Sequence, residues 1–285
     1  MPSSRREFLA TVGGAAFGIA CGRAVSSGTN APVRRLDRIG VQLYTLRDLA
    51  AKDLAGALAQ VAQIGYREVE FAGYHGKSAR EVRTMLDANG LTAPSAHIGL
   101  EIIERNAAQV FDDARVVGHE YITVPFLMPD QRRTLDDFRR IATRLNQAGR
   151  AASEAGFKLA YHNHDFELKP IDGMVPLDVM MAATDPMLVS FQIDVYWVTN
   201  AGGSPIDWLE RHGDRISMLH LKDSGPAPEL QIREVGAGTI DFAAILARAR
   251  NVRHFFVEQD RSADPIASIR ASYRYLAGLD IPTIA

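Results

Sequence analysis

Two histidines that lie two residues apart in the chain are the first candidates for a functional role. His162 and His164 follow an apolar run that begins at Leu159. Residues i and i+2 of a β-strand point to the same face, so both imidazoles are expected to face the same way. A core strand that ends in polar residues is typical of the C-terminal rim of a (β/α)8 barrel, where active sites lie. The segment therefore predicts a functional site at such a rim.

Ligand-type residues also end the three apolar runs that come next along the chain. Asp194 follows Phe-Gln-Ile, His220 follows Ser-Met-Leu, and Glu258 follows Phe-Phe-Val. A charged residue at the end of a core strand is costly to bury unless it is paired or bound to a metal. Imidazole and carboxylate ligands together suit Mn²⁺, Zn²⁺, Co²⁺ or Fe²⁺, and suit Mg²⁺ less well. The set predicts a divalent metal site, although any one residue alone has a structural alternative, such as a helix cap for Asp194.

Eight strand-like segments alternate with eight helix-like segments, and these elements must position the ligands. The expected strands are 38–44, 66–71, 91–97, 121–126, 157–162, 188–194, 215–221 and 254–258. The expected helices are 53–64, 78–90, 101–117, 134–155, 176–183, 205–212, 241–248 and 265–279. Strands separated by helices pair in parallel, and eight such units fit one TIM barrel. A doubly wound open sheet is the alternative, but no Gly-rich dinucleotide turn follows the first segment.

The N-terminus has the pattern of an export signal. Arg5-Arg6 precede a mildly apolar run at 10–20, and a polar stretch leads to Pro32. We expect a twin-arginine signal and linker at 1–33, a barrel domain at 34–285, and a periplasmic or secreted protein. The alternative is an ordinary chain start in which the two arginines occur next to each other by chance. Lipid attachment at Cys21 is a less favoured alternative, because the residues before it match a lipobox imperfectly.

Composition excludes several classes of protein. The 285 residues are 47% apolar and 23% charged, which predicts a packed core. The net charge is −2 and no basic run follows the signal, so we expect no nucleic-acid partner. The single cysteine cannot form an intrachain disulfide. No later apolar run reaches transmembrane length, so the mature protein is expected to have no membrane span.

Five motifs together resemble the xylose isomerase-like TIM-barrel superfamily, and within it the sugar phosphate isomerase/epimerase branch. The motifs are Tyr161-His-Asn-His-Asp-Phe-Glu167, Gln192-Ile-Asp194, His220-Leu-Lys-Asp223, Val235-Gly-Ala-Gly-Thr-Ile-Asp241 and Val257-Glu258. The resemblance covers approximately residues 36–280 and implies a TIM barrel that acts on a small carbohydrate. Relatives are often dimers or tetramers, so the resemblance is compatible with a homo-oligomer.

In the 3-epimerases of this branch, a Glu, an Asp, a His and a Glu from strands five to eight hold the metal. Motif by motif, the resemblance implies His162, Asp194, His220 and Glu258 as ligands, with Mn²⁺ as the first expectation. His162 replaces a glutamate that is both a ligand and an acid/base in the epimerases. Trp197 stands where they place a substrate-binding histidine. Both departures argue against simple 3-epimerisation.

The expected chemistry is proton abstraction next to a carbonyl. A divalent ion that bridges a carbonyl and an adjacent hydroxyl acidifies the carbon between them. We expect Glu258 to remove the proton and Lys222 to help stabilise the metal-bound enediolate, with His162 as the third catalytic residue. The sequence thus predicts a metal-dependent sugar isomerase or epimerase. The alternative is a lyase or hydrolase that cleaves 3-keto-glycosides by β-elimination at the same site.

Further residues at the rim are expected to contact substrate, and each has a structural alternative. Glu70 and His97 could bind sugar hydroxyls or form structural pairs. His164 and Glu167 could contact substrate, support the metal or cap a loop. Trp197 could stack on a sugar ring or fill the barrel mouth.

Overall fold

A closed ring of eight parallel strands forms the centre of the molecule. The computed structural model describes residues 32–284, and its barrel strands pair in the order β11-β2-β3-β4-β5-β6-β7-β8. Their bounds are β2 Gly40–Gln42, β3 Glu68–Phe71, β4 Thr92–His97, β5 Tyr121–Val124, β6 Lys158–His162, β7 Val189–Asp194, β8 Ile216–Leu221 and β11 His254–Val257. Each of these eight strands lies within the range predicted for it from the sequence, and the predicted TIM barrel is confirmed.

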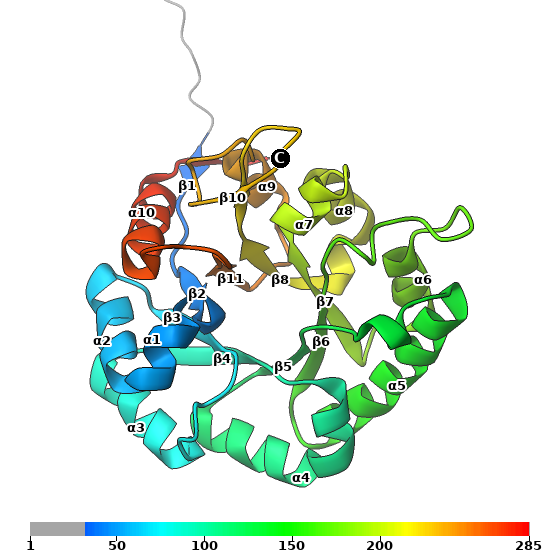
Figure 1. The fold of residues 1–285 in the computed structure, drawn as a ribbon, viewed down its shortest axis with the longest axis horizontal. Helices are drawn as coiled ribbons and strands as arrows, with labels where there is room; N and C mark the ends of the chain where they lie inside the picture. The colour runs from blue at the N-terminus through cyan, green and yellow to red at the C-terminus, as the bar shows by residue number, and fades with distance from the viewer. Residues whose placement is uncertain (1–31, 285) are drawn as a thin grey trace, which may run out of the picture. The chain divides into compact units, whose positions relative to one another are not determined.

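Helices surround this ring (Figure 1). They are α2 Leu54–Ile64, α3 Ala79–Asn89, α4 Leu100–Val117, α5 Leu135–Glu154, α6 Pro176–Ala183, α8 Pro205–His212, α9 Phe242–Arg248 and α10 Pro265–Gly278. Local chemistry sets their ends. Ser78 and Glu81 form a reciprocal capping box at the start of α3, and Gly90 ends that helix with a φ of 62°.

Several short elements were not predicted from the sequence. They are β1 Val33–Arg34, η1 Leu43–Leu46, α1 Arg47–Lys52, η2 Pro129–Gln131, α7 Val195–Asn200, η3 Gly213–Arg215, β9 Asp223–Ser224, β10 Ile232–Arg233 and β12 Ile281–Pro282. β9 and β10 form a two-stranded antiparallel ribbon, and β1 pairs with β12 in another. The predicted export signal and Cys21 lie outside the described residues, apart from the last residues of the linker.

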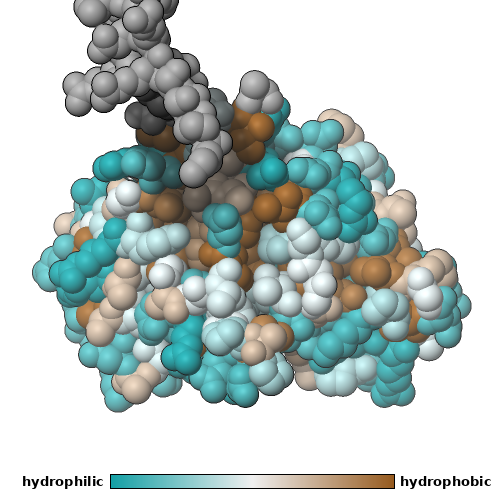
Figure 2. All heavy atoms as spheres, turned by 90° about the horizontal axis from the view of Figure 1, so that it is seen from above, coloured by the Kyte–Doolittle hydropathy of each residue, from teal (hydrophilic) through white to brown (hydrophobic). Residues whose placement is uncertain are grey.

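Most of the core lies between the strands and the helices, and the barrel interior is filled by side chains. Tyr121, Ala160, Met218 and Phe256 form a separate buried cluster. On the face shown in Figure 2, hydrophilic residues predominate and apolar residues form smaller groups between them. Among the described residues, no helix has the length and apolar character that crossing a membrane requires.

A buried histidine on the helical side of the barrel should make stability depend on pH. His119 Nδ1 lies 2.5 Å from the Ala93 carbonyl oxygen and Nε2 lies 2.8 Å from the Tyr74 hydroxyl. Burial lowers the pKa of His119 from 6.5 to about 4, so the imidazole is neutral in the folded protein at neutral pH. The unfolded chain therefore binds one more proton than the folded protein between these two values, and stability falls as the pH drops through that window.

We expect the His119→Gln variant to lose less stability on acidification than the wild type. The difference should be about 2 kcal/mol between about pH 7 and about pH 5. Urea unfolding of both proteins at the two pH values measures it. An identical pH dependence would show that His119 does not carry the effect.

Candidate metal centre and active site

The four predicted metal ligands lie together at the carboxyl ends of neighbouring strands. His162 ends β6, Asp194 ends β7, His220 lies in β8, and Glu258 follows β11. The register places Asp194 opposite His220. Each of the four side chains offers a ligand atom, and these atoms lie within 4.8 Å of one another. Four adjacent parallel strands thus bring together residues that are far apart in the chain.

The donor set fits a divalent cation. Among the described residues, His162 Nδ1 is buried without a hydrogen-bond partner, and Asp194 Oδ2 is buried with the Lys222 ammonium 3.0 Å away. Buried polar atoms are normally satisfied, so an unpartnered imidazole nitrogen that lies near three more ligand atoms fits a metal site. His162 is fully buried among other cationic groups, and burial followed by these neighbours lowers its pKa far below the usual range. A neutral imidazole is the form that binds a metal.

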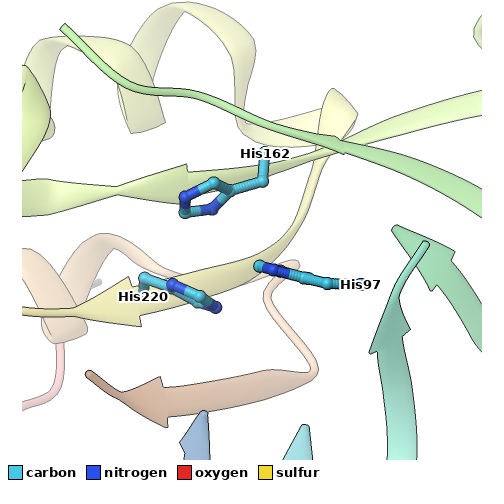
Figure 3. Close-up of side chains that lie close together, drawn as sticks. All are labelled: His97, His162 and His220. Atoms are coloured by element: carbon cyan, nitrogen blue, oxygen red, sulfur yellow. The ribbon is translucent and has the colours of Figure 1, made fainter. Parts of the chain in front are cut away.

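Three histidines form a second cluster. His97, His162 and His220 come from three different strands and point toward one another (Figure 3). The ring centroids are 4.5 Å apart for His162 and His220, and 5.4 Å apart for His97 and His220. His97 Nε2 is already 2.9 Å from Gln192 Oε1 and 3.2 Å from Glu70 Oε2. The set with Asp194 and Glu258 therefore fits a metal better than the three histidines do.

His220 is held between two carboxylates. Its Nδ1 lies 3.0 Å from Glu258 Oε2, and its Nε2 lies 2.6 Å from Glu70 Oε2. Burial alone would lower the pKa of His220, but the two carboxylates outweigh it and raise the pKa to about 10. At neutral pH the metal-free imidazole is therefore protonated on both nitrogens. To bind a metal, Nδ1 on the side of Glu258 would release its proton, while Nε2 keeps its proton and donates it to Glu70.

Lys222 lies among the carboxylates of the site. Its Nζ is 2.8 Å from Glu258 Oε2, 3.0 Å from Asp194 Oδ2 and 3.1 Å from Asp260 Oδ2. The side chain is only 1% exposed, yet these three carboxylates outweigh burial and keep its pKa well above the usual value. The ammonium therefore stays charged. We did not predict a role for Asp260 from the sequence, although it lies only two residues after the predicted ligand Glu258.

Glu70 and Glu167, both predicted to contact substrate, are buried and hydrogen-bonded within the protein. Both side chains have zero exposure. The Glu70 oxygens accept hydrogen bonds from Gln42, Ser95 and Gln192 as well as meeting His220. Glu167 accepts one hydrogen bond from the Tyr161 hydroxyl at 2.5 Å and another from the His164 backbone N–H at 2.8 Å. Protein donors already occupy these oxygens, which agrees with the structural alternatives given above. Glu70 orients the His220 ring and Glu167 holds the His164 backbone, and their contact with substrate stays a prediction.

A cavity of about 1020 Å³ opens above the candidate ligands. Its lining includes His162, Lys222 and Glu258 together with three residues predicted to contact substrate, His97, His164 and Trp197. Residues 229–231 of the loop before β10, and Ile232 at the start of β10, also line the cavity. The site thus combines a charged floor with a cavity large enough for a small organic ligand. The roles predicted for these residues stay predictions.

Glu70 should matter for metal binding although it is not part of the cavity lining. In a Glu70→Gln variant, an amide N–H₂ would face the donors that now meet a carboxylate. We expect metal affinity to fall about 10–100-fold and stability to fall by about 1–3 kcal/mol. Metal titration calorimetry and urea unfolding measure the two effects. Glu154→Gln, at an exposed position on α5, is the matched control, and equal behaviour of the two variants would contradict the orienting role.

Fold and site together define a TIM-barrel protein with a candidate divalent-metal centre at the carboxyl rim of its strands. The xylose isomerase-like TIM barrel family matches residues 58–278, and this chain belongs to that family. The resemblance predicted from the motifs is confirmed.

Individual proteins similar to this chain include enzymes. The chain is 26% identical over 232 residues to inosose dehydratase from Geobacillus kaustophilus (strain HTA426), covering 67% of this chain and 74% of the relative. The crystal structure of a sugar phosphate isomerase/epimerase from Parabacteroides distasonis ATCC 8503 superposes with a TM-score of 0.74 at 25% identity, covering 86% and 99%. The IOLI protein, whose crystal structure holds a zinc atom, has a TM-score of 0.67 at 14% identity, covering 83% and 95%. The first two are named as enzymes that act on sugars or related compounds, which agrees with the predicted class of enzyme.

Proposed function

We propose that this protein is a divalent-metal-dependent enzyme that removes a proton next to the carbonyl of a carbohydrate. The observation that carries the proposal is the set of four ligand atoms within 4.8 Å of one another, beneath a cavity of about 1020 Å³. His162, Asp194, His220 and Glu258 would hold the ion. Bound there, a divalent ion would act as a Lewis acid that polarises the carbonyl and acidifies the adjacent C–H group. Mn²⁺ is our first expectation, and zinc, the ion in the IOLI structure, is the next.

Glu258 is the best placed base. It lines the cavity and is 6% exposed, the only one of the four proposed ligands other than His162 to reach the cavity wall. Burial would raise its pKa, but Lys222 and His220 outweigh burial and hold the pKa well below the usual value. Glu258 is therefore ionised at neutral pH and able to accept a proton.

Lys222 supplies a fixed positive charge. Because its pKa is raised well above the usual value, it does not exchange protons during turnover at neutral pH. An ammonium group held in place by three carboxylates stabilises negative charge that develops on a substrate oxygen without reorganising. Lys222 thus acts electrostatically rather than as an acid or base.

The fate of the proton decides the type of reaction. Return of the proton by Glu258 to the neighbouring carbon gives an isomer, provided that the hydroxyl proton also passes to the former carbonyl oxygen. This needs only one base at carbon. Epimerisation needs a second acid on the opposite face, and the strand-five position that would supply a carboxylate is His162. Isomerisation is therefore our first expectation. Elimination of a group β to the carbonyl is the second candidate, because it also needs one base at carbon and a relative is named as a dehydratase. The β-oxygen would leave with the bonding electron pair and take a proton from water.

Two measurements test the proposal. The metal-free protein should gain thermal stability on addition of Mn²⁺ or Zn²⁺, because a ligand that binds only the folded state stabilises it. The metal-loaded protein in D₂O should exchange a substrate C–H proton next to the carbonyl, with products followed by NMR for a free ketose and for a 3-keto-glycoside. The proposal fails if no ion raises the melting temperature and neither compound exchanges. An isomer from the ketose supports the first candidate, and an unsaturated ketone from the 3-keto-glycoside supports the second.

We also propose export through the twin-arginine route, supported by Arg5-Arg6 and the apolar run that follows. Replacement of both arginines by lysine should leave the protein in the cytosolic fraction of a bacterium that carries the pathway. Unchanged export of the variant would contradict this route.

A further inference from the structure

The cavity above the candidate ligands is larger than one sugar ring needs. Its volume is about 1020 Å³, whereas clefts that enclose drug-sized ligands run from about 300 to 1,000 Å³. A single monosaccharide held at His162 and Glu258 would leave much of this space to water. The cavity therefore has room for a second unit joined to the ring that reacts.

One wall of the cavity is aromatic. Phe126, His164 and Trp197 line it. The His164 ring stands perpendicular to that of Phe126, with centroids 5.2 Å apart, and is tilted by 40° to that of Trp197 at 5.5 Å. Phe126 is 41% exposed. The Arg132 guanidinium lies 5.0 Å from the centroid of the Phe126 ring, and His164 stacks on Phe166, so each of these two rings has one face engaged with the protein. The remaining aromatic surface of the wall is of the kind against which the C–H faces of a pyranose ring pack.

Polar side chains line the same cavity as the aromatic wall. They include Glu229, Gln231 and Arg261. Their carboxylate, amide and guanidinium groups can exchange hydrogen bonds with hydroxyl groups of a ligand. A ring that carries hydroxyl groups on its edge and C–H groups on its faces therefore suits this cavity better than a purely apolar group.

The opposite wall is less suited to such a ring. The Arg47 guanidinium lies 4.5 Å from the centroid of the Tyr44 ring and covers one of its faces. Arg47 also donates hydrogen bonds to the carbonyl oxygens of Tyr44 and Asp260, at 3.0 and 3.1 Å. Two of its donors are therefore engaged with the protein. This side offers the single ring of Tyr44, whereas the other wall offers three adjoining rings.

We propose that Phe126, His164 and Trp197 form a subsite for a second sugar ring, linked to the ring that reacts at the metal centre. The substrate is then a keto-sugar that carries another sugar unit, rather than a free monosaccharide. The identity of the reacting ring rests on the proposed function above, whereas binding of the second ring does not. Binding and turnover can consequently be tested separately.

The binding test uses the Zn²⁺-loaded protein and cellobiose, which lacks the ketone and cannot react. Saturation-transfer NMR should show contacts to both glucose rings, and cellobiose should bind about 10-fold more tightly than methyl β-glucoside, an estimate for one buried ring contact. Phe126→Ala should weaken cellobiose binding about 10-fold, the same estimate in reverse. Met128→Ala is the control, because Met128 is exposed and lies outside the cavity lining.

Three outcomes would overturn the subsite: no binding of cellobiose, saturation of only one ring, or equal effects of the two alanine variants. Tighter binding of phenyl β-glucoside than of cellobiose would assign the wall to an aryl group and would also overturn it.

The turnover test compares the 3-keto derivatives of cellobiose and of methyl β-glucoside. The ratio of their kcat/KM values should favour the disaccharide and should fall about 10-fold in Phe126→Ala but not in Met128→Ala, the same estimate as for binding. If both compounds exchange their protons at equal rates, the subsite is contradicted and the proposed function is not. If neither compound exchanges a proton but cellobiose still binds, the proposed function is contradicted and the subsite is not.

Discussion

We expect the Glu258→Gln variant to lose proton exchange into solvent almost completely. The change removes the ionised carboxylate at the cavity wall and keeps the size of the side chain. A positioned general base contributes about 10²–10⁴-fold to rate, so turnover should fall by about 10³-fold at saturating metal. Deuterium exchange next to the substrate carbonyl measures the loss directly.

Metal binding must be measured alongside, because Glu258 is also a proposed ligand. Each assay should therefore be run at metal concentrations that saturate the variant, as determined by titration calorimetry. Glu210→Gln is the matched control, since Glu210 is an exposed acid paired with Arg248 outside the cavity lining. Exchange within 10-fold of the wild type at saturating metal would rule out Glu258 as the base, since that is less than the smallest contribution of about 10²-fold expected from a base.

The barrel and the four candidate ligands could be predicted because each depends on a local pattern. An apolar run that ends in His162, Asp194, His220 or Glu258 marks both a core strand and the point where it reaches the rim. Once eight such runs alternate with helices, parallel pairing places their carboxyl ends at the same edge. Proximity of the ligands follows from topology, without knowledge of any side-chain contact.

The environment of Glu70 and Glu167 could not be predicted, because it depends on contacts between distant segments. Glu70 meets Gln42, Ser95 and Gln192 from three other strands, and no local pattern marks those partners. Glu167 turns back toward Tyr161 and the His164 backbone after the strand has ended. We expected both glutamates to contact substrate because a position at the end of a strand does not show which way its side chain faces.

The short helix α7 was missed for a different reason. Val195–Asn200 contains β-branched and aromatic residues that fit a strand as well as a helix. Asp194 resolves the ambiguity, because its Oδ1 accepts hydrogen bonds from the backbone N–H groups of Tyr196 and Trp197 and so caps the helix. The helix-cap alternative for Asp194 and its candidate role as a metal ligand are therefore compatible, since they use different oxygens.

Replacement of Lys222 by methionine should strongly destabilise the metal-free protein and make its stability depend on metal. Lys222 is the buried ammonium that neutralises Asp194, Glu258 and Asp260, at distances from 2.8 to 3.1 Å. Removal of one partner from a buried ionic network costs about 3–5 kcal/mol. For a domain of this size that corresponds to a drop in melting temperature of about 6–20 °C. Lys169→Met is the control, because Lys169 is exposed and its pair with Asp165 is a surface i,i+4 contact of small energy.

A divalent ion should reverse this loss in the Lys222→Met variant. The ammonium contacts Asp194 Oδ2 and Glu258 Oε2, which are atoms of two proposed ligands, so it competes electrostatically with a cation at the same place. Without Lys222 the carboxylates keep an uncompensated negative charge, and we expect Mn²⁺ to bind about 10-fold more tightly than in the wild type. Mn²⁺ should then raise the melting temperature of the variant more than that of the wild type, while turnover falls because the fixed positive charge near the substrate is gone. Weaker Mn²⁺ binding in the variant would show that Lys222 supports the metal site instead of competing with it, and calorimetric titration of both proteins distinguishes the two cases.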